Sequence, residues 1–325
     1  MTISLWGSAH AWQRTAMGGI EDLREAIIHA DLSPVQLSRM PSAGTLALAD
    51  FDGFGFSTGS ISGKVTISGP LSDKCVTLGT GICFPPGCRQ WQHDVETGSL
   101  AIFMPGDTHD ALYVPGSIYA AVTLTYERLD EVAADLEVTI DVRKLGGSGI
   151  YNGRLKPERF ARLQRLFLEL HAHAQSSGDP AGELLLSLAS HFGTAPAIRA
   201  SSVRPPKYGL VLSRARDFIH AHISEPLSVS AIARAAEASP RTLHRAFQVL
   251  LEETPYSYVH KMRLDCIRSD IIRHAGGEET LAHIANRWGV SELGRAAHEY
   301  RSLFGELPSQ TRANARKSST QVHTI

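Results

Sequence analysis

The chain has 325 residues, of which 43% are hydrophobic and 20% are charged, and its formal net charge is −1. Single hydrophobic cores stop growing efficiently near ~250 residues, so this length predicts two domains. The sequence has no uninterrupted apolar run of the ~18 residues that span a bilayer, and its N-terminus lacks the basic, apolar and small-residue pattern of an export signal. These features exclude a membrane-spanning protein, and we expect a cytoplasmic protein with no membrane partner.

Charge is unevenly distributed along the chain. From Lys207 onward there are 16 Lys and Arg residues against 12 Asp and Glu, whereas the preceding part has 16 against 21. A basic C-terminal part behind an acidic N-terminal part is the asymmetry expected when only one domain meets phosphate. This balance alone is weak evidence, because small imbalances are also common on inert surfaces.

The N-terminal part has the pattern of a sheet followed by helices. Residues 46–126 alternate short apolar runs such as KVTISGP, CVTLGTGICF and YAAVTLTY with Gly and Pro turns, which predicts an antiparallel barrel or sandwich. The segment PERFARLQRLFLELHAHA then carries an apolar stripe at helical spacing, formed by Phe160, Leu163, Phe167 and Leu170. This stripe either docks on the sheet or pairs with its twin in a second chain.

A break in composition separates the two parts. Residues 193–207 (GTAPAIRASSVRPPK) interrupt all periodicity with Gly, Ala, Ser and three Pro, as linkers do. We therefore assign residues 1–192 to a sensor and dimerisation domain, 193–207 to the linker, 208–316 to a C-terminal domain and 317–325 to a disordered tail.

The C-terminal part begins with two short helices and a tight turn. Ser228 is placed to cap a helix over 229–235, and Ser239 to cap the next helix, with Pro240 at its first position. The apolar residues of PRTLHRAFQVL share one face, formed by Leu243, Phe247 and Leu250. The opposite, polar face comprises Arg241, Thr242, His244, Arg245 and Gln248. Two short helices with a basic outer face on the second predict a helix-turn-helix unit.

The same pattern repeats downstream. Thr280 is expected to cap a helix over 281–288, Gly289 to make the turn, and Ser291 to cap the helix of LGRAAHEYRSLF. The outer face of that helix offers Leu293, Gly294, Arg295 and His298. Between the units, TPYSYVHKMRLDCIRSDIIRHA predicts a helix of about 30 Å, close to the ~34 Å between successive major grooves. One chain could therefore place both reading helices in adjacent grooves.

These C-terminal segments resemble the AraC/XylS family of transcription regulators. The resemblance is carried by LSVSAIARAAEASPRTLHRAF, TPYSYVHKMRL and IANRWGVSELGRAAHEYRSLFGELPSQTR, and it covers both units and the helix between them. Residues 20–190 more weakly resemble the sensor half of such regulators. The resemblance implies an α+β chain in which a cupin-like antiparallel β-barrel with flanking helices precedes an all-α domain of two helix-turn-helix units.

The resemblance also implies roles and partners. Arg241, His244 and Arg245 match the family's base-facing positions, and Arg reads guanine O6 and N7 with a discrimination of ~1–3 kcal/mol per pair. In the second unit we expect Arg295 to be the main reader, since Leu293 and Gly294 offer only an apolar contact or close approach. The implied function is an activator that binds promoter or operator DNA as a homodimer, responds to a small-molecule effector and recruits RNA polymerase.

Other chemistry receives little support from the sequence. It contains no phosphate-binding loop, nucleophile elbow or His-Glu-x-x-His motif, and His93 and His109 are isolated, so we predict no catalytic residue, cofactor or metal. The aromatic residues best placed to line a barrel cavity are Phe54, Phe56, Phe84, Trp91 and Phe103. The alternatives are a barrel enzyme fused to a DNA-binding module, a regulator controlled by a protein partner, and a metal or thiol sensor that uses Cys75, Cys83 and Cys88.

Overall fold

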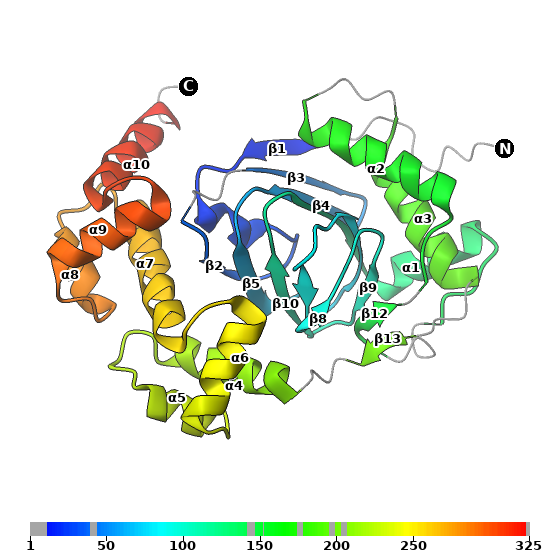
Figure 1. Cartoon of the computed structure of the whole chain (residues 1–325). Coiled ribbons are helices and arrows are strands. Elements are labelled where there is room, and N and C mark those ends of the chain that lie inside the picture. The colour runs from blue at the N-terminus through cyan, green and yellow to red at the C-terminus, as the bar shows by residue number, and fades with distance from the viewer. Residues whose placement is uncertain are drawn as a thin grey trace. The chain divides into compact units, whose positions relative to one another are not determined.

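The computed structural model describes residues 12–39, 44–141, 147–151, 153–173, 178–194, 199–202 and 207–322. The chain divides into two compact units. The first comprises Met1–Gly18, Asp22–Pro34 and Ala43–Arg204, and the second comprises Gly19–Glu21, Val35–Ser42 and Pro205–Ile325. The first unit is rich in sheet and the second is helical (Figure 1). The main division, after Arg204, falls inside the segment expected to be a linker.

The described strands of the first unit form two antiparallel sheets. The larger sheet has the order β1 (Gln13–Ala16), β3 (Gly44–Phe51), β4 (Phe54–Ile61), β11 (Ser117–Leu124), β6 (Val76–Cys83), β9 (Leu100–Phe103), β12 (Gly149–Tyr151) and β13 (Arg199–Ser202). The smaller sheet has the order β2 (Ser33–Gln36), β5 (Val65–Pro70), β10 (Thr108–Tyr113), β7 (Arg89–Gln90) and β8 (His93–Asp94). Each sheet keeps two edge strands, so the antiparallel pattern expected from the sequence occurs as two open sheets.

Helices cover one face of the larger sheet (Figure 1). They are α1 (Tyr126–Asp135), α2 (Pro157–His171) and α3 (Pro180–Thr194), and a short 3-10 helix spans Ile20–Glu25. The main apolar core of the unit lies between these helices and the sheet, where Phe54, Val122, Leu163 and Phe167 are all less than 2% exposed. The core is therefore built on alternate residues of the strands, because successive side chains of a strand point to opposite faces.

The apolar stripe of α2 packs within its own chain. Leu163, Phe167 and Leu170 belong to the core beneath the larger sheet, and Phe160 packs against its border. At the end of the helix, the His171 ring bonds Thr45 Oγ1 of β3 through Nδ1 at 2.5 Å and Thr58 Oγ1 of β4 through Nε2 at 3.0 Å. Of the two roles open to this stripe, docking on the sheet is the one that the structure shows.

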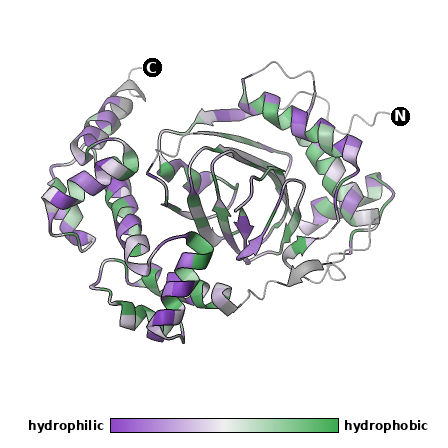
Figure 2. Ribbon diagram, in the orientation of Figure 1, coloured by the Kyte–Doolittle hydropathy of each residue, from purple (hydrophilic) through white to green (hydrophobic). Residues whose placement is uncertain are grey.

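The second unit is a succession of helices. They are α4 (Lys207–Ala221), α5 (Val229–Ala235), α6 (Pro240–Leu251), α7 (Pro255–Arg273), α8 (Leu281–Arg287), α9 (Leu293–Phe304) and α10 (Pro308–Val322). Hydrophilic and hydrophobic residues alternate along these helices in Figure 2, as expected for helices that bury one face and hydrate the other. No helix among the described residues is long and apolar enough to cross a bilayer.

Two boundaries differ from the sequence-based assignment. β13 lies inside residues 193–207 and pairs with β12, so this part of the expected linker adds a strand to the larger sheet. The last helix continues to Val322, whereas a disordered tail was expected from residue 317. Both differences have one cause: the RASS and KSSTQV segments lack apolar periodicity, so their structure depends on neighbouring elements rather than on their own pattern.

The buried position of His171 predicts a loss of stability in acid. Burial, assisted by the positive charge of Arg14, lowers the pKa of His171 from 6.5 to about 4. Below pH 6.5 the unfolded chain therefore takes up a proton at this site while the folded chain does not, and the free energy of unfolding falls until the pH reaches about 4. At pH 5 the expected loss is about 2 kcal/mol relative to pH 7. Denaturant unfolding at both pH values measures it, and His171→Gln should remove this part of the pH dependence.

Candidate functional site

The first helix-turn-helix unit is formed by α5 and α6. Ser228 accepts a hydrogen bond from the Ala231 amide at 3.1 Å, and Ser239 accepts one from the Thr242 amide at 3.1 Å. Both N-caps are those predicted from the sequence. In the turn, Glu237 has a φ of 53°, a left-handed conformation that costs a non-glycine residue ~1–2 kcal/mol. The turn geometry is therefore imposed by the packing of α5 and α6 rather than by the residue itself.

The two faces of α6 are sharply separated. Leu243, Ala246, Phe247, Leu250 and Leu251 are buried. On the opposite face, Arg241, His244, Arg245 and Gln248 are exposed, and Thr242 is half-buried. The Thr242 hydroxyl bonds Ser239 Oγ at 2.9 Å, so part of its hydrogen-bonding capacity serves the cap. The helix thus presents two guanidinium groups, an imidazole and an amide, which suit contacts with phosphates and base edges.

The second unit repeats this arrangement with one difference. Thr280 caps α8 through the His283 amide at 3.2 Å, and Gly289 turns with a φ of 70°. The expected cap of α9 was wrong: Glu292, rather than Ser291, occupies the N-cap position, and its side chain makes no capping hydrogen bond. The helix therefore begins one residue later than the Ser pattern indicates, because local capping preference is weak compared with tertiary packing.

The outer face of α9 is accessible. Gly294, Arg295 and His298 are exposed, whereas the Leu293 side chain lies outside the described part of the chain. Arg295 Nε donates to Glu299 Oε1 at 3.0 Å, and this hydrogen bond raises the pKa of Arg295. The guanidinium of Arg295 is fully exposed, so solvent screens this pair and the group can exchange Glu299 for another anionic partner at little cost.

A further exposed residue was not predicted from the sequence. Tyr256, in the first turn of α7, is 68% exposed, and its ring stacks on His260 with a centroid distance of 6.4 Å. His260 Nε2 in turn lies 2.5 Å from Glu299 Oε2, the residue paired with Arg295. The contact chain places Tyr256 beside the second reading helix. An exposed aromatic residue next to a helix cap is the signal that could have identified it.

Arg263 of α7 connects the two helix-turn-helix units. Its Nε donates to Ile223 O at 3.0 Å and its Nη2 to Glu225 O at 2.6 Å, both just before α5. Its Nη1 donates to Gly289 O at 3.3 Å, in the turn of the second unit. One guanidinium thus holds backbone carbonyls from both units, and a β-carbon at Gly289 would crowd it. Burial lowers the pKa of Arg263.

Asp270, also on α7, holds the second helix-turn-helix unit in place. Its buried carboxylate accepts hydrogen bonds from Arg287 Nη1 and Trp288 Nε1, each at 2.9 Å and each at the end of α8. Arg273 Nη1 adds a bond of 2.9 Å from the solvent side. A buried carboxylate that is satisfied by several charged and polar donors fixes the geometry of its partners.

A cavity of about 250 Å³ lies beneath the second reading helix. Its walls come from α7, α8 and α9 and from the start of α10, and they include Ile267, Ala285, Ala296 and Leu307. Ala296 is on the buried face of α9 and is only 8% exposed. A larger residue at this position would reach into the space. The second helix-turn-helix unit, formed by α8 and α9, is therefore less tightly packed than native cores usually are.

The sheet-rich compact unit of the N-terminal part contains a separate cavity of about 50 Å³ between its two sheets. Of the aromatic residues expected to line it, Phe84 and Phe103 do so, and Trp91 contacts Phe103 with a centroid distance of 4.8 Å. Phe54 and Phe56 instead lie in the core on the helix-covered face. Both side chains lie on the face of β4 that is turned away from the cavity. The sequence could not show this, because the pattern of a strand alone does not reveal which of its faces carries the helices.

The cysteines are not gathered into a metal site. Among the described residues, no three His, Cys, Asp or Glu residues lie close enough to hold a metal ion. Cys88 is buried, its Sγ lies 3.1 Å from Ser117 Oγ, and burial raises its thiol pKa. Cys75 and Cys83 are partly exposed and form no disulfide. A raised thiol pKa reduces the thiolate fraction that redox sensing requires.

Comparison with known proteins shows which proteins the chain is similar to, most clearly in its C-terminal part. A family model described as a helix-turn-helix domain matches residues 232–314. The "XylDLEGF operon transcriptional activator" of Pseudomonas putida is 26% identical over 265 residues, which cover 79% of this chain and 81% of that protein. The chain is similar to transcriptional regulators of the AraC/XylS type, and its C-terminal part matches their helix-turn-helix domain. Its helical unit therefore carries the family's domain for binding double-stranded DNA.

Other similarities are shorter or more distant. The "Probable thc operon regulatory protein" of Rhodococcus erythropolis is 36% identical over 100 residues, 31% of this chain and 30% of that protein. A solved structure of a transcriptional regulator with an AraC-type DNA-binding domain, from Chromobacterium violaceum, is 28% identical and covers 32% of this chain and 91% of that chain, with a TM-score of 0.31. The AraC-like transcriptional activator CuxR is 14% identical and covers 78% of this chain and 94% of that chain, with a TM-score of 0.36.

Removal of the Asp270 carboxylate should destabilise the helical unit. Asp270→Ala removes the buried acceptor of the half-buried Trp288 indole N–H and of Arg287, and we expect a loss of about 1–3 kcal/mol in the free energy of unfolding. Arg273→Ala is the matched control, because it removes only a 62% exposed partner of the same carboxylate, worth less than ~1 kcal/mol. Denaturant melts followed by Trp288 fluorescence measure both effects. Equal losses for the two variants would contradict the anchoring role of Asp270.

Filling the cavity beneath α9 should have the opposite effect. Ala296→Leu adds apolar volume where the packing leaves space, and a gain of roughly 0.5–2 kcal/mol is expected. Ala313→Leu makes the same substitution at an exposed position of α10 and should change stability by less than ~0.5 kcal/mol. Thermal unfolding distinguishes the two variants. Destabilisation by Ala296→Leu would show that the cavity cannot accept a larger side chain.

Proposed function

We propose that this protein is a sequence-specific activator that reads its operator with α6 and α9. The observation that carries the proposal is the exposure of Arg241, His244 and Arg245 on α6, and of Arg295 on α9, while the opposite faces of both helices are buried. The 19 residues of α7 separate the two units by about 28 Å at 1.5 Å per residue. This length suits reading helices in successive major grooves, which are ~34 Å apart.

Electrostatics favours an unequal contribution of the two units. Of the guanidinium groups proposed to face DNA, Arg295 is paired with Glu299, whereas Arg241 and Arg245 form no ion pair with any other described residue. Contact of α9 with DNA therefore includes the cost of replacing Glu299, and Gly294 adds no polar group. We assign the larger share of base readout to α6 and a smaller share to α9, with Tyr256 as an additional contact near the second helix.

The first unit is proposed to sense a small-molecule effector. The cavity between the sheets supports this role, because no Asp, Glu, Lys or Arg is among its described lining residues. The two open sheets take the place of the expected cupin-like barrel in this proposal. That lining suits ligand binding better than acid-base catalysis. The relatives named as operon transcriptional activators support activation as the output. RNA polymerase as a partner, a homodimer as the active form and the cytoplasm as the compartment complete the proposal.

The proposal is tested with the full chain. Selection from randomised duplexes should enrich one operator sequence, and Arg245→Ala should weaken its binding by ~1–3 kcal/mol and relax the choice of one base pair. Arg165→Ala, on the exposed face of α2, is a matched control and should leave affinity unchanged. Gel shifts across operator variants report both quantities. If Arg245→Ala bound every operator variant as wild type does, Arg245 would not be a base-reading residue.

A further inference from the structure

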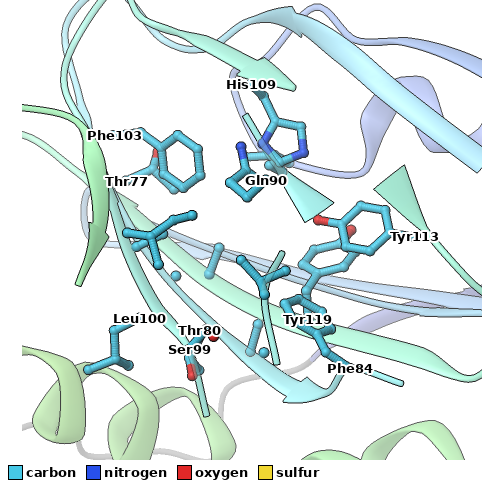
Figure 3. Close-up of a pocket in the computed structure, with 18 residues that line it drawn as sticks. Thr77, Thr80, Phe84, Gln90, Ser99, Leu100, Phe103, His109, Tyr113 and Tyr119 are labelled. Atoms are coloured by element: carbon cyan, nitrogen blue, oxygen red, sulfur yellow. The ribbon is translucent and has the colours of Figure 1, made fainter. Parts of the chain in front are cut away.

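The cavity between the sheets is bordered by a continuous series of aromatic rings. Phe103 and His109 have ring centroids 5.6 Å apart, and His109 and Tyr113 are 6.4 Å apart. Tyr113 then lies 5.8 Å from Phe84 and 5.6 Å from Tyr119. In Figure 3, Gln90 and His109 lie near one end of this series, and Tyr119 and Phe84 lie near the other. Such a border offers flat apolar surfaces to a ligand, with polar groups at defined points.

Two buried polar groups of the lining have no protein partner. Gln90 Nε2 and Thr80 Oγ1 form no hydrogen bond among the described residues, although the side chains are 7% and 4% exposed. Buried polar groups are almost always hydrogen-bonded, since an unsatisfied donor retains its full desolvation penalty. An amide N–H donates and does not accept, so Gln90 Nε2 can donate to a hydrogen-bond acceptor on a molecule inside the cavity.

The surroundings favour an uncharged acceptor. The described lining contains no Lys or Arg that could neutralise an anion. Burial raises the tyrosine pKa values of both Tyr113 and Tyr119, which means that the same environment disfavours a negative charge on its own side chains. The Tyr119 hydroxyl already donates to Ala26 O at 2.5 Å and is not available to an anion. A bound carboxylate would therefore lose more free energy of hydration than it would gain from contacts in the cavity.

Phe84 separates this cavity from the surface. Phe84 and Val95 line both the inner cavity and an outer groove of about 690 Å³. Phe84 is partly exposed and its ring lies against Gly81, where a β-carbon would overlap it. A benzene-sized ligand occupies a cavity of ~150 Å³, three times the closed volume. Rotation of Phe84 toward the groove is the route by which the cavity gains that volume.

We infer that the cavity binds a flat, uncharged molecule whose carbonyl oxygen accepts a hydrogen bond from Gln90 Nε2 and which enters past Phe84. The inference rests on the effector role proposed for the first unit and specifies its ligand class. Gln90 anchors the polar end of the ligand, the rings of Phe103, Tyr113 and Phe84 enclose its apolar body, and Thr80 lies toward the far end of the cavity, near Phe84 (Figure 3).

The test compares benzamide with benzoate, which have the same shape but differ in charge at pH 7.5. Calorimetric titration of the full chain should show benzamide binding at least ~10-fold more tightly than benzoate. Gln90→Leu should weaken benzamide about 3- to 10-fold, the value of one hydrogen bond. Gln13→Leu is the matched control at an exposed position of β1 and should not change the affinity. Phe84→Ala should strengthen benzamide binding, because it removes the barrier and enlarges the cavity.

Three results would overturn the inference. They are benzoate binding as tightly as benzamide, a Gln90→Leu variant that is folded and binds benzamide normally, and absence of binding by both wild type and Phe84→Ala. Each preparation is also tested in the operator gel shift without ligand. Loss of operator binding there would count against the proposed DNA-binding function, whereas retained operator binding with a failed titration counts against the ligand class alone.

Discussion

The arrangement of the helical unit depends on buried polar groups of one helix, α7. Arg263 binds carbonyls that precede α5 and a carbonyl in the turn before α9, while Asp270 binds the end of α8. A helix of this length could join two units loosely if only apolar contacts were involved, because apolar packing has no strong directional preference. Hydrogen bonds from a guanidinium and to a carboxylate are directional and fix orientation as well as distance. The spacing of the reading helices is therefore a property of α7.

The exposed cations of the reading helices follow from this constraint. Each reading helix buries its apolar face against its own unit, so the polar face has no protein surface to meet. Arg245 and Arg295 nevertheless differ, since only Arg295 has a carboxylate one turn away. Pairing with Glu299 holds the Arg295 side chain in place, whereas no carboxylate of a described residue holds that of Arg245. The cavity of about 250 Å³ beneath α9 indicates that α9 is packed less tightly against its neighbours.

The first unit uses the two faces of one sheet for different purposes. Phe54 and Phe56 serve the core under the helices, whereas Tyr119 of β11 points into the space between the sheets. The first face is tightly packed and contributes stability. The second face leaves Thr80 with unused hydrogen-bonding capacity, as does Gln90 of the smaller sheet across the cavity, which stability alone would select against. The larger sheet thus has one face that packs against helices and one face that borders a cavity.

The sequence by itself determined the elements whose information is local. Caps such as Ser239 and Thr280, the turn at Gly289 and the amphipathic pattern of α6 specify both helix-turn-helix units, because these signals act within a few residues. The exposed faces of α6 and α9 follow from the same periodicity. The antiparallel sheets were also evident from alternation.

Only the tertiary structure decided which strand face meets the helices, and so which aromatic residues reach the cavity. Phe54 and Phe84 have equivalent sequence signals, yet one is core and the other borders the cavity, since the choice depends on sheet pairing across long separations. The pairing of Arg295 with Glu299, the contacts of Arg263 and the strand formed by β13 likewise depend on partners that local pattern does not specify. Long-range contacts, unlike caps and periodicity, leave no short signature in the chain.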